Sequence, residues 1–301
     1  MKKITLAAVL ALATLGASAQ VTLSGKYSIW GDSTKTGTAD RTGTMVTDPT
    51  SNITFGVKED LGGGLSARAV VETTLGTTNS VDRTNNTQLG DRQATVGLAG
   101  KMGSVDVGRN VHSQFVALAS NDSFSALYGS IAGDVHNLRG LRFSNGAFFA
   151  TNLGPVNATF DRSNNGSGVE DVTSASLGAR LGPVNAVVAN HVNAAGTEKS
   201  TVVGANARLG NTAVFYSHSD NQSLTAGETK KGDLVGISQG FGAVTAKASY
   251  GRTNTEVKAY NVGLDYNLSK RTAVGVAYRS VDLAGATQDI KQVGVGITHR
   301  F

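Results

Sequence analysis

The end of the chain alternates between two kinds of side chain. Val293, Val295, Ile297 and Phe301 are apolar, interrupted only by His299, and the residues between them are polar or glycine. A two-residue period indicates a strand with one apolar and one polar face. Residues 20–30 repeat the pattern. A terminal strand leaves an unpaired edge, so a chain built of such strands is expected to pair its first strand with its last and close into a barrel.

Short turn signals divide the sequence into units of similar length, most of them about 30 residues. The turns are Leu61–Gly64, Lys101–Gly103, Asn152–Pro155, Leu181–Pro183, Leu209–Asn211, Gly240–Gly242 and Leu268–Lys270. Such a unit holds two strands of roughly ten residues and one loop, and ten residues is the length of a tilted strand that crosses a bilayer. Seven turns separate eight units, which predicts an all-β fold of sixteen antiparallel strands with both termini at the short-turn side.

Composition supports a barrel with a wet interior. Only 40% of the residues are apolar, glycine is abundant (38) and proline is scarce (3), which is thin for a packed soluble core of this size. The absence of cysteine excludes disulfides and thiolate metal sites. The five histidines are scattered without paired-ligand spacing, and no nucleophile-elbow motif is present. We therefore predict no catalytic residues, no metal site and no cofactor, and a protein that is not an enzyme.

The amino-terminus resembles an export signal. Two lysines precede an apolar run, and Ala17-Ser18-Ala19 forms a small-residue cleavage site. We expect a signal peptide over residues 1–19 and one barrel domain over residues 20–301. No later apolar run is long enough for a membrane-spanning helix, so the mature chain is either soluble or a β-barrel. The basic pI near 9.4 comes without any basic run, and nucleic acid is not an expected partner.

Five blocks of sequence resemble one family. They are VTLSGKYSIWGD (21–32), NITFGVKEDLGGGLSARAVVE (52–72), DRQATVGLAGKMGSVDVGRN (91–110), YNLSKRTAVGVAY (266–278) and GITHRF (296–301). Together they make the chain similar to the general porins of the Gram-negative outer membrane, of the betaproteobacterial and neisserial type. The resemblance implies a sixteen-stranded transmembrane β-barrel whose long third external loop folds into the lumen. It also implies a homotrimer in outer-membrane lipid and lipopolysaccharide, assembled with periplasmic chaperones and the barrel-insertion machinery.

Strand parity indicates which charges face the lumen. The expected lumen cations outnumber the acids by eight to five, which suggests a mild preference for anions. The cations are Lys26, Lys58, Arg68, Arg180, Arg208, Lys247, Arg279 and Arg300, and the acids are Asp60, Glu72, Asp106, Asp161 and Asp265. Arg139 and Arg142 are expected to extend the basic wall.

The long segment from Arg109 to Asn137 is the candidate constriction loop. It carries several apolar side chains, so we expect it to pack inward, with Asp122 and Asp134 facing Arg139 and Arg142 to impose a transverse field. The loop lacks the Pro-Glu-Phe-Gly-like signature of the family. On the strand that follows, Phe148 stands where a lumen cation is usual.

These features predict a passive, water-filled and mildly anion-preferring diffusion channel for ions and small hydrophilic solutes. Two alternatives remain open at this point. Phe148 and the aromatic loop favour an outer-membrane barrel with a plugged lumen that acts as an adhesin or an enzyme. Periodicity alone is also compatible with a soluble, secreted β-sandwich that binds sugar.

Overall fold

The computed structural model describes residues 19–76, 88–136, 142–164, 171–193, 196–223, 226–283 and 289–301. The predicted signal peptide, residues 1–19, lies outside this part of the chain except for Ala19. No helix in the described ranges is long and apolar enough to cross a membrane.

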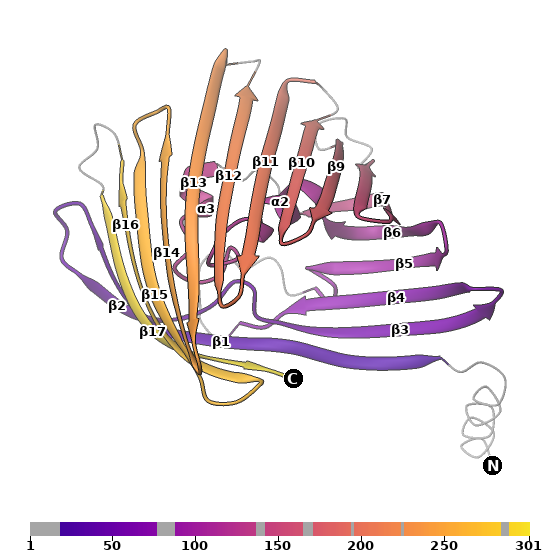
Figure 1. Cartoon of the computed structure of the whole chain (residues 1–301), viewed down its shortest axis with the longest axis horizontal. Coiled ribbons are helices and arrows are strands. Elements are labelled where there is room, and N and C mark those ends of the chain that lie inside the picture. The colour runs from indigo at the N-terminus through magenta and orange to yellow at the C-terminus, as the bar shows by residue number, and fades with distance from the viewer. Residues whose placement is uncertain are drawn as a thin grey trace.

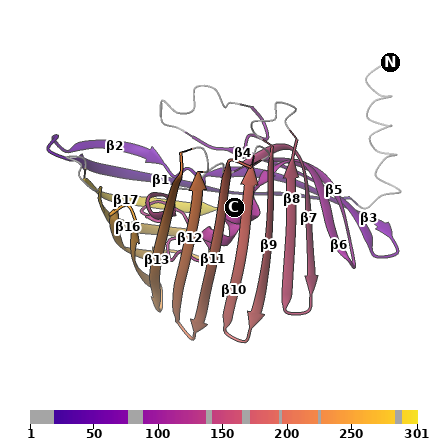
Figure 2. The same ribbon diagram turned by 90° about the horizontal axis from the view of Figure 1, so that it is seen from above.

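Within these ranges, seventeen strand segments form one antiparallel sheet that closes on itself (Figures 1 and 2). In chain order they are β1 (Gln20–Thr36), β2 (Thr42–Thr47), β3 (Asn52–Gly62), β4 (Leu65–Thr74), β5 (Gln93–Gly100), β6 (Gly103–Val111), β7 (Arg142–Leu153), β8 (Val156–Ser163), β9 (Val172–Leu181), β10 (Val184–Asn193), β11 (Glu198–Leu209), β12 (Thr212–Ser223), β13 (Glu228–Phe241), β14 (Val244–Thr253), β15 (Lys258–Asn267), β16 (Thr272–Asp282) and β17 (Ile290–Arg300). From β3 onwards each strand pairs with the next in sequence, β1 pairs with both β2 and β3, and β1 also pairs with β17 from Lys26↔Arg300 to Thr36↔Ile290.

The predicted count of sixteen strands is confirmed, because β2 and β3 are two pieces of one barrel strand. Both pair with β1: β2 lies along residues 29–34 of β1 and β3 along residues 20–26. Residues 48–51 interrupt the ladder between them. Pro49 lies in this interruption, and proline has no N–H to donate to a sheet.

The two faces of the wall differ as the alternation predicts. Apolar side chains of alternate residues are exposed on the outside, as on β15 with Val262 and Leu264, while the residues between them face the interior. Tyr216, Tyr250 and Tyr260 stand outside in register-linked positions towards the long-loop end, and Phe241 and Tyr266 stand outside at the short-turn end. An outward apolar band between aromatic rows is typical of a barrel in a bilayer.

Residues 112–136, which follow β6, lie in the interior and contain α2 (Ser113–Ser120) and α3 (Ala132–His136). Figure 1 shows both helices enclosed by the strands. The buried apolar side chains form small clusters where this segment meets the wall, and two facing open sheets are absent from the described residues. The β-sandwich alternative is therefore wrong.

A cation on the outer face should destabilise the barrel. We expect Val262→Lys, at the middle of β15 and 49% exposed, to lower the free energy of unfolding by about 2–4 kcal/mol. The lumen-facing Thr245→Lys on β14 should change it by only about 0.5 kcal/mol. Urea titration of protein refolded into phospholipid vesicles measures both. Equal costs for the two variants would contradict the assignment of the faces.

Candidate functional site

The segment of residues 112–136, called the lumen loop here, is fastened to the inner wall at three places. The first is the start of α2, where His112 Nδ1 lies 3.0 Å from Asp161 Oδ2 on β8 and the Ser113 hydroxyl bonds the same carboxylate. The amide of Gln114 then donates to Ser200 on β11. A buried carboxylate thus holds the beginning of the loop against β8.

The second fastening lies where the loop crosses to β1. The ring of Tyr128 stacks on Trp30 with centroids 4.2 Å apart, and its hydroxyl donates to Asp32. Its backbone N–H donates to Asp48 Oδ2 at 2.8 Å. The Tyr128 ring lies directly against the backbone of β17, where a Cβ at Gly294 would collide with it. Glycine on the lumen face therefore permits the close approach of the loop.

The third fastening is α3, which lies against β12 to β16. Asp134 Oδ2 accepts a hydrogen bond of 2.9 Å from Arg279 Nη1 on β16. His136 is 1% exposed, and its two ring nitrogens lie 2.9 Å from the hydroxyls of Ser217 and Ser219 on β12. The predicted inward fold of the long segment is confirmed by these contacts.

The loop leaves an opening on the opposite side, towards β4 to β7. A cavity of about 420 Å³ separates α2 from this wall. Val116, 48% exposed, and Ser120 face it from the loop. Glu72, Arg92 and Arg142 line it from the wall. The aromatic residues Phe124 and Tyr128 pack against the wall around Trp30, so they do not close this passage.

The charges at this opening are predominantly basic. Arg92 Nε pairs with Glu72, and Arg142 Nε donates to the backbone carbonyl of Arg92 at 2.9 Å. Two guanidinium groups therefore accompany one carboxylate.

The remaining predicted lumen residues lie around the interior, several of them in pairs. Arg68 bonds Asp106 and Ser104, with Lys58 beside it in register. Lys247 pairs with Asp265, and Lys26 Nζ is 3.5 Å from Asp48 Oδ1. Further along the wall, Arg180 and Phe148 line another cavity, of about 490 Å³, and Arg208 lies near the short-turn end of β11. Phe148 thus faces the lumen, as the sequence indicated, and it does not line the opening between α2 and β4 to β7.

Three expectations about the loop need correction. Arg109 belongs to β6 and not to the loop; its guanidinium bonds the carbonyl of Asp91 and the Ser144 hydroxyl. Asp122 is 1% exposed and accepts hydrogen bonds from within the loop, and Asp134 is bound by Arg279. Neither acid faces Arg142, so the predicted transverse field between these acids and Arg142 is wrong.

Arg139 lies outside the described residues, so its predicted place on the basic wall stays a prediction. The alternation of apolar and polar positions along the strands did not identify two residues at the site. Arg92 precedes its strand, and Asp48 lies in the break between β2 and β3. This alternation shows which side chains face the lumen only for residues inside strands. The proline at position 49 was the one signal that marked the break.

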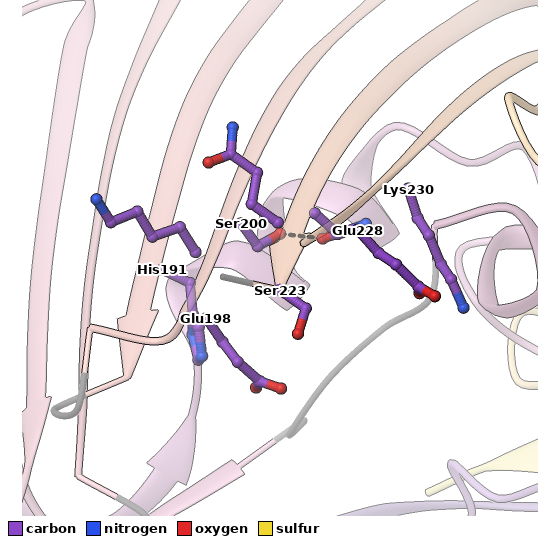
Figure 3. Close-up of a pocket in the computed structure, with 9 residues that line it drawn as sticks. His191, Glu198, Ser200, Ser223, Glu228 and Lys230 are labelled. Atoms are coloured by element: carbon purple, nitrogen blue, oxygen red, sulfur yellow. Dashed lines mark hydrogen bonds between the residues drawn. The ribbon is translucent and has the colours of Figure 1, made fainter. Parts of the chain in front are cut away.

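A second, much smaller pocket opens at the long-loop end of β10 to β13 (Figure 3). His191, Glu198 and Glu228 line it, and its volume of about 20 Å³ leaves room for about one water molecule. No group of three or more His, Asp or Glu side chains within the described ranges is arranged to hold a metal ion. This pocket is too small for a solute.

A family model described as Gram-negative porin matches residues 6–286. The chain belongs to the Gram-negative porin family. A member of this family is a passive diffusion channel of the outer membrane and not an enzyme, and a closed barrel with a polar, partly open lumen suits that activity. No curated protein sequence matches the chain.

Solved structures of several other proteins share the fold. An anion-selective porin from Comamonas acidovorans has 22% identity and a TM-score of 0.77, with 94% of this chain and all of that chain covered. OmpF of Salmonella typhi, in complex with daunomycin, has 17% identity and a TM-score of 0.72, covering 93% and 97%. The trimer form of OmpT from Vibrio cholerae has 11% identity and a TM-score of 0.68, covering 94% and 99%.

The attachment of α3 should weaken in acid. Burial lowers the pKa of His136 from its ordinary 6.5 to about 4; the nearby His218 adds to this effect and Asp233 opposes it. The docked loop therefore holds His136 neutral, whereas a released loop would bind a proton near pH 6.5. Docking has its full stability above pH 6.5 and loses about 3 kcal/mol as the pH falls to 4. Single-channel recordings should show more closures across this window.

The control is His136→Gln, which keeps hydrogen-bonding groups but does not titrate. Burial raises the pKa of Asp134, which works in the opposite direction as the pH falls, and this contribution is present in both proteins. The variant should lack the increase in closures between pH 6.5 and 4. An unchanged pH response in His136→Gln would contradict the role of His136.

Proposed function

We propose that this porin conducts small anions and hydrophilic solutes through the opening between the lumen loop and β4 to β7, with a mild preference for anions. The observation that supports the proposal most is the cavity of about 420 Å³ whose wall carries Arg92 and Arg142 against Glu72. Charge of one sign in a narrow, low-dielectric passage raises the local concentration of the opposite ion. The anion-selective porin from Comamonas acidovorans, which shares the fold, is consistent with this preference.

The remaining lumen charges support the same sign. Arg68, Lys247 and Arg279 are matched by acids, and those pairs keep the wall polar without a large net field. Lys58 and Arg208 have no ion pair with another described residue. The predicted net positive charge of the lumen therefore comes from cations such as Lys58 and Arg208 that have no carboxylate partner.

The assembly of the protein is part of this proposal. We infer a homotrimer in outer-membrane lipid and lipopolysaccharide, reached by way of a signal peptide over residues 1–19, periplasmic chaperones and the barrel-insertion machinery. The trimer form of OmpT from Vibrio cholerae, a structural neighbour, supports the oligomeric state for this fold. The outward band of apolar side chains supplies the surface for lipid and for neighbouring subunits.

The plugged barrel remains the second candidate function. The features that favoured it were Phe148 and the aromatic residues of the loop. Phe124 lies between Trp30 and Ala277 of the wall, and a passage remains on the other side of α2. The geometry thus favours permeation over a plug.

Purified protein in planar bilayers tests this function. We expect discrete conductance steps, and a reversal potential of anionic sign under a KCl gradient. Arg142→Glu should move the reversal potential towards zero or to cationic sign, because it replaces a cation at the narrow passage with an acid. Lys101→Glu, in a short turn, should leave it nearly unchanged. Protein that refolds but gives no steps would refute the channel, and a cationic sign in the unaltered protein would refute the preference.

A further inference from the structure

A separate cavity of about 210 Å³ lies on the short-turn side of the lumen loop, against β14 to β17 and β1. Its apolar wall comes from the loop, through Phe124 and Leu127, and from Trp30 and Ala277 of the barrel. Its polar wall includes Lys26, Thr298 and Arg300. The main opening between α2 and β4 to β7 shares none of these residues.

Two cations are held side by side at the edge of this cavity. Lys26 on β1 and Arg300 on β17 are direct partners in the register and both face the lumen. Like charges directly opposite each other in a sheet destabilise it unless an anion lies between or beside them. Lys26 has Asp48 as its partner, 3.5 Å away. Arg300 is exposed, and its side chain has no hydrogen bond or ion pair with another described residue.

The other charges in the cavity balance each other. Lys247 pairs with Asp265, and its ammonium also lies 5.4 Å from the centroid of the Phe124 ring. Among the residues that line the cavity, the three cations and the two acids Asp48 and Asp265 leave one positive charge, which belongs to Arg300; the carboxylate of Phe301, which accepts a hydrogen bond of 3.0 Å from the backbone N–H of Gly25, is not part of the lining. The cavity therefore combines an unbalanced guanidinium with an apolar surface a short distance away, and an amphiphilic anion fits both.

We propose that this cavity binds small carboxylates that carry an apolar or aromatic body, before or after they cross the main opening. The carboxylate lies against Arg300 and Lys26, and the body lies against Leu127 and Phe124. The binding is reversible and involves no covalent step. This inference rests on the proposed channel function and adds a class of solute that the channel retains at a second place.

Benzoate is the probe, compared with acetate, which lacks the ring, and with benzyl alcohol, which lacks the charge. Added to single channels in KCl, benzoate should reduce the chloride current at lower concentration than either comparator. It should act at lower concentration when it is added from the short-turn side of the bilayer, because the cavity lies on that side of the lumen loop.

Variants separate the two parts of the site. Arg300→Gln should raise the half-blocking concentration of benzoate about tenfold, because it removes one charge-assisted hydrogen bond to the carboxylate. Leu127→Ala should raise it several-fold while leaving the weak effect of acetate unchanged. Arg208→Gln is the matched control, since it removes a lumen cation outside the cavity, and it should change the benzoate effect less than twofold.

The possible failures are distinguishable. If refolded protein gives no conductance steps, the channel function itself is refuted. If the steps are normal but benzoate acts no more strongly than acetate, the binding site is refuted and the channel stands. The site is also refuted if Arg208→Gln weakens benzoate as much as Arg300→Gln does, because the lumen charge as a whole would then explain the effect. If Arg300→Gln does not refold, Leu127→Ala alone decides the proposal.

Discussion

The structure depends on the need to pair every backbone N–H and C=O inside a bilayer. A sheet can meet that need only by closing, because an open edge in lipid leaves a row of unsatisfied groups. The register between β1 and β17, together with the backbone bonds that join Gly25 to Phe301, completes the ring. In a closed ring, the two-residue period places one set of side chains towards lipid and the other set around the interior.

The lumen loop is the second consequence of closure. A ring of sixteen strands is wide enough that its interior cannot be filled by wall side chains alone. The loop occupies part of that space, and polar contacts hold it: Asp161 at the start of α2, Asp48 at Tyr128 and Arg279 at α3. The fastenings lie on β8, β11, β12, β16 and β1, and none of them lies on β4 to β7, so the passage is displaced towards that part of the wall. The polar groups that hold the loop to the rest of the wall therefore set the width of the channel.

The sequence predicted the fold well because strand faces and turn spacing are local properties. The closing pair, the sixteen strands and the lumen positions of Arg68 and Lys247 all follow from alternation and counting. The site was harder to predict. Whether Asp122 and Asp134 face the passage depends on the path of the loop backbone. Asp122 accepts hydrogen bonds from a turn of the loop itself, and Asp134 is bound by Arg279 of β16, which is distant in sequence. Arg109 was predicted to belong to the loop, but β6 extends to Val111 and therefore includes it.

The orientation of the lumen loop is the central claim, and it has a direct test because the chain contains no cysteine. Val116 is 48% exposed towards the passage, whereas Ser123 is 6% exposed and bonds Ser249 of the wall at 2.6 Å. A cationic methanethiosulfonate reagent, applied to single channels, should reduce the conductance of Val116→Cys in discrete steps and leave that of Ser123→Cys unchanged. Rapid modification of Ser123→Cys with an unaffected Val116→Cys would show that the other face of the loop lines the pore, and would contradict the account.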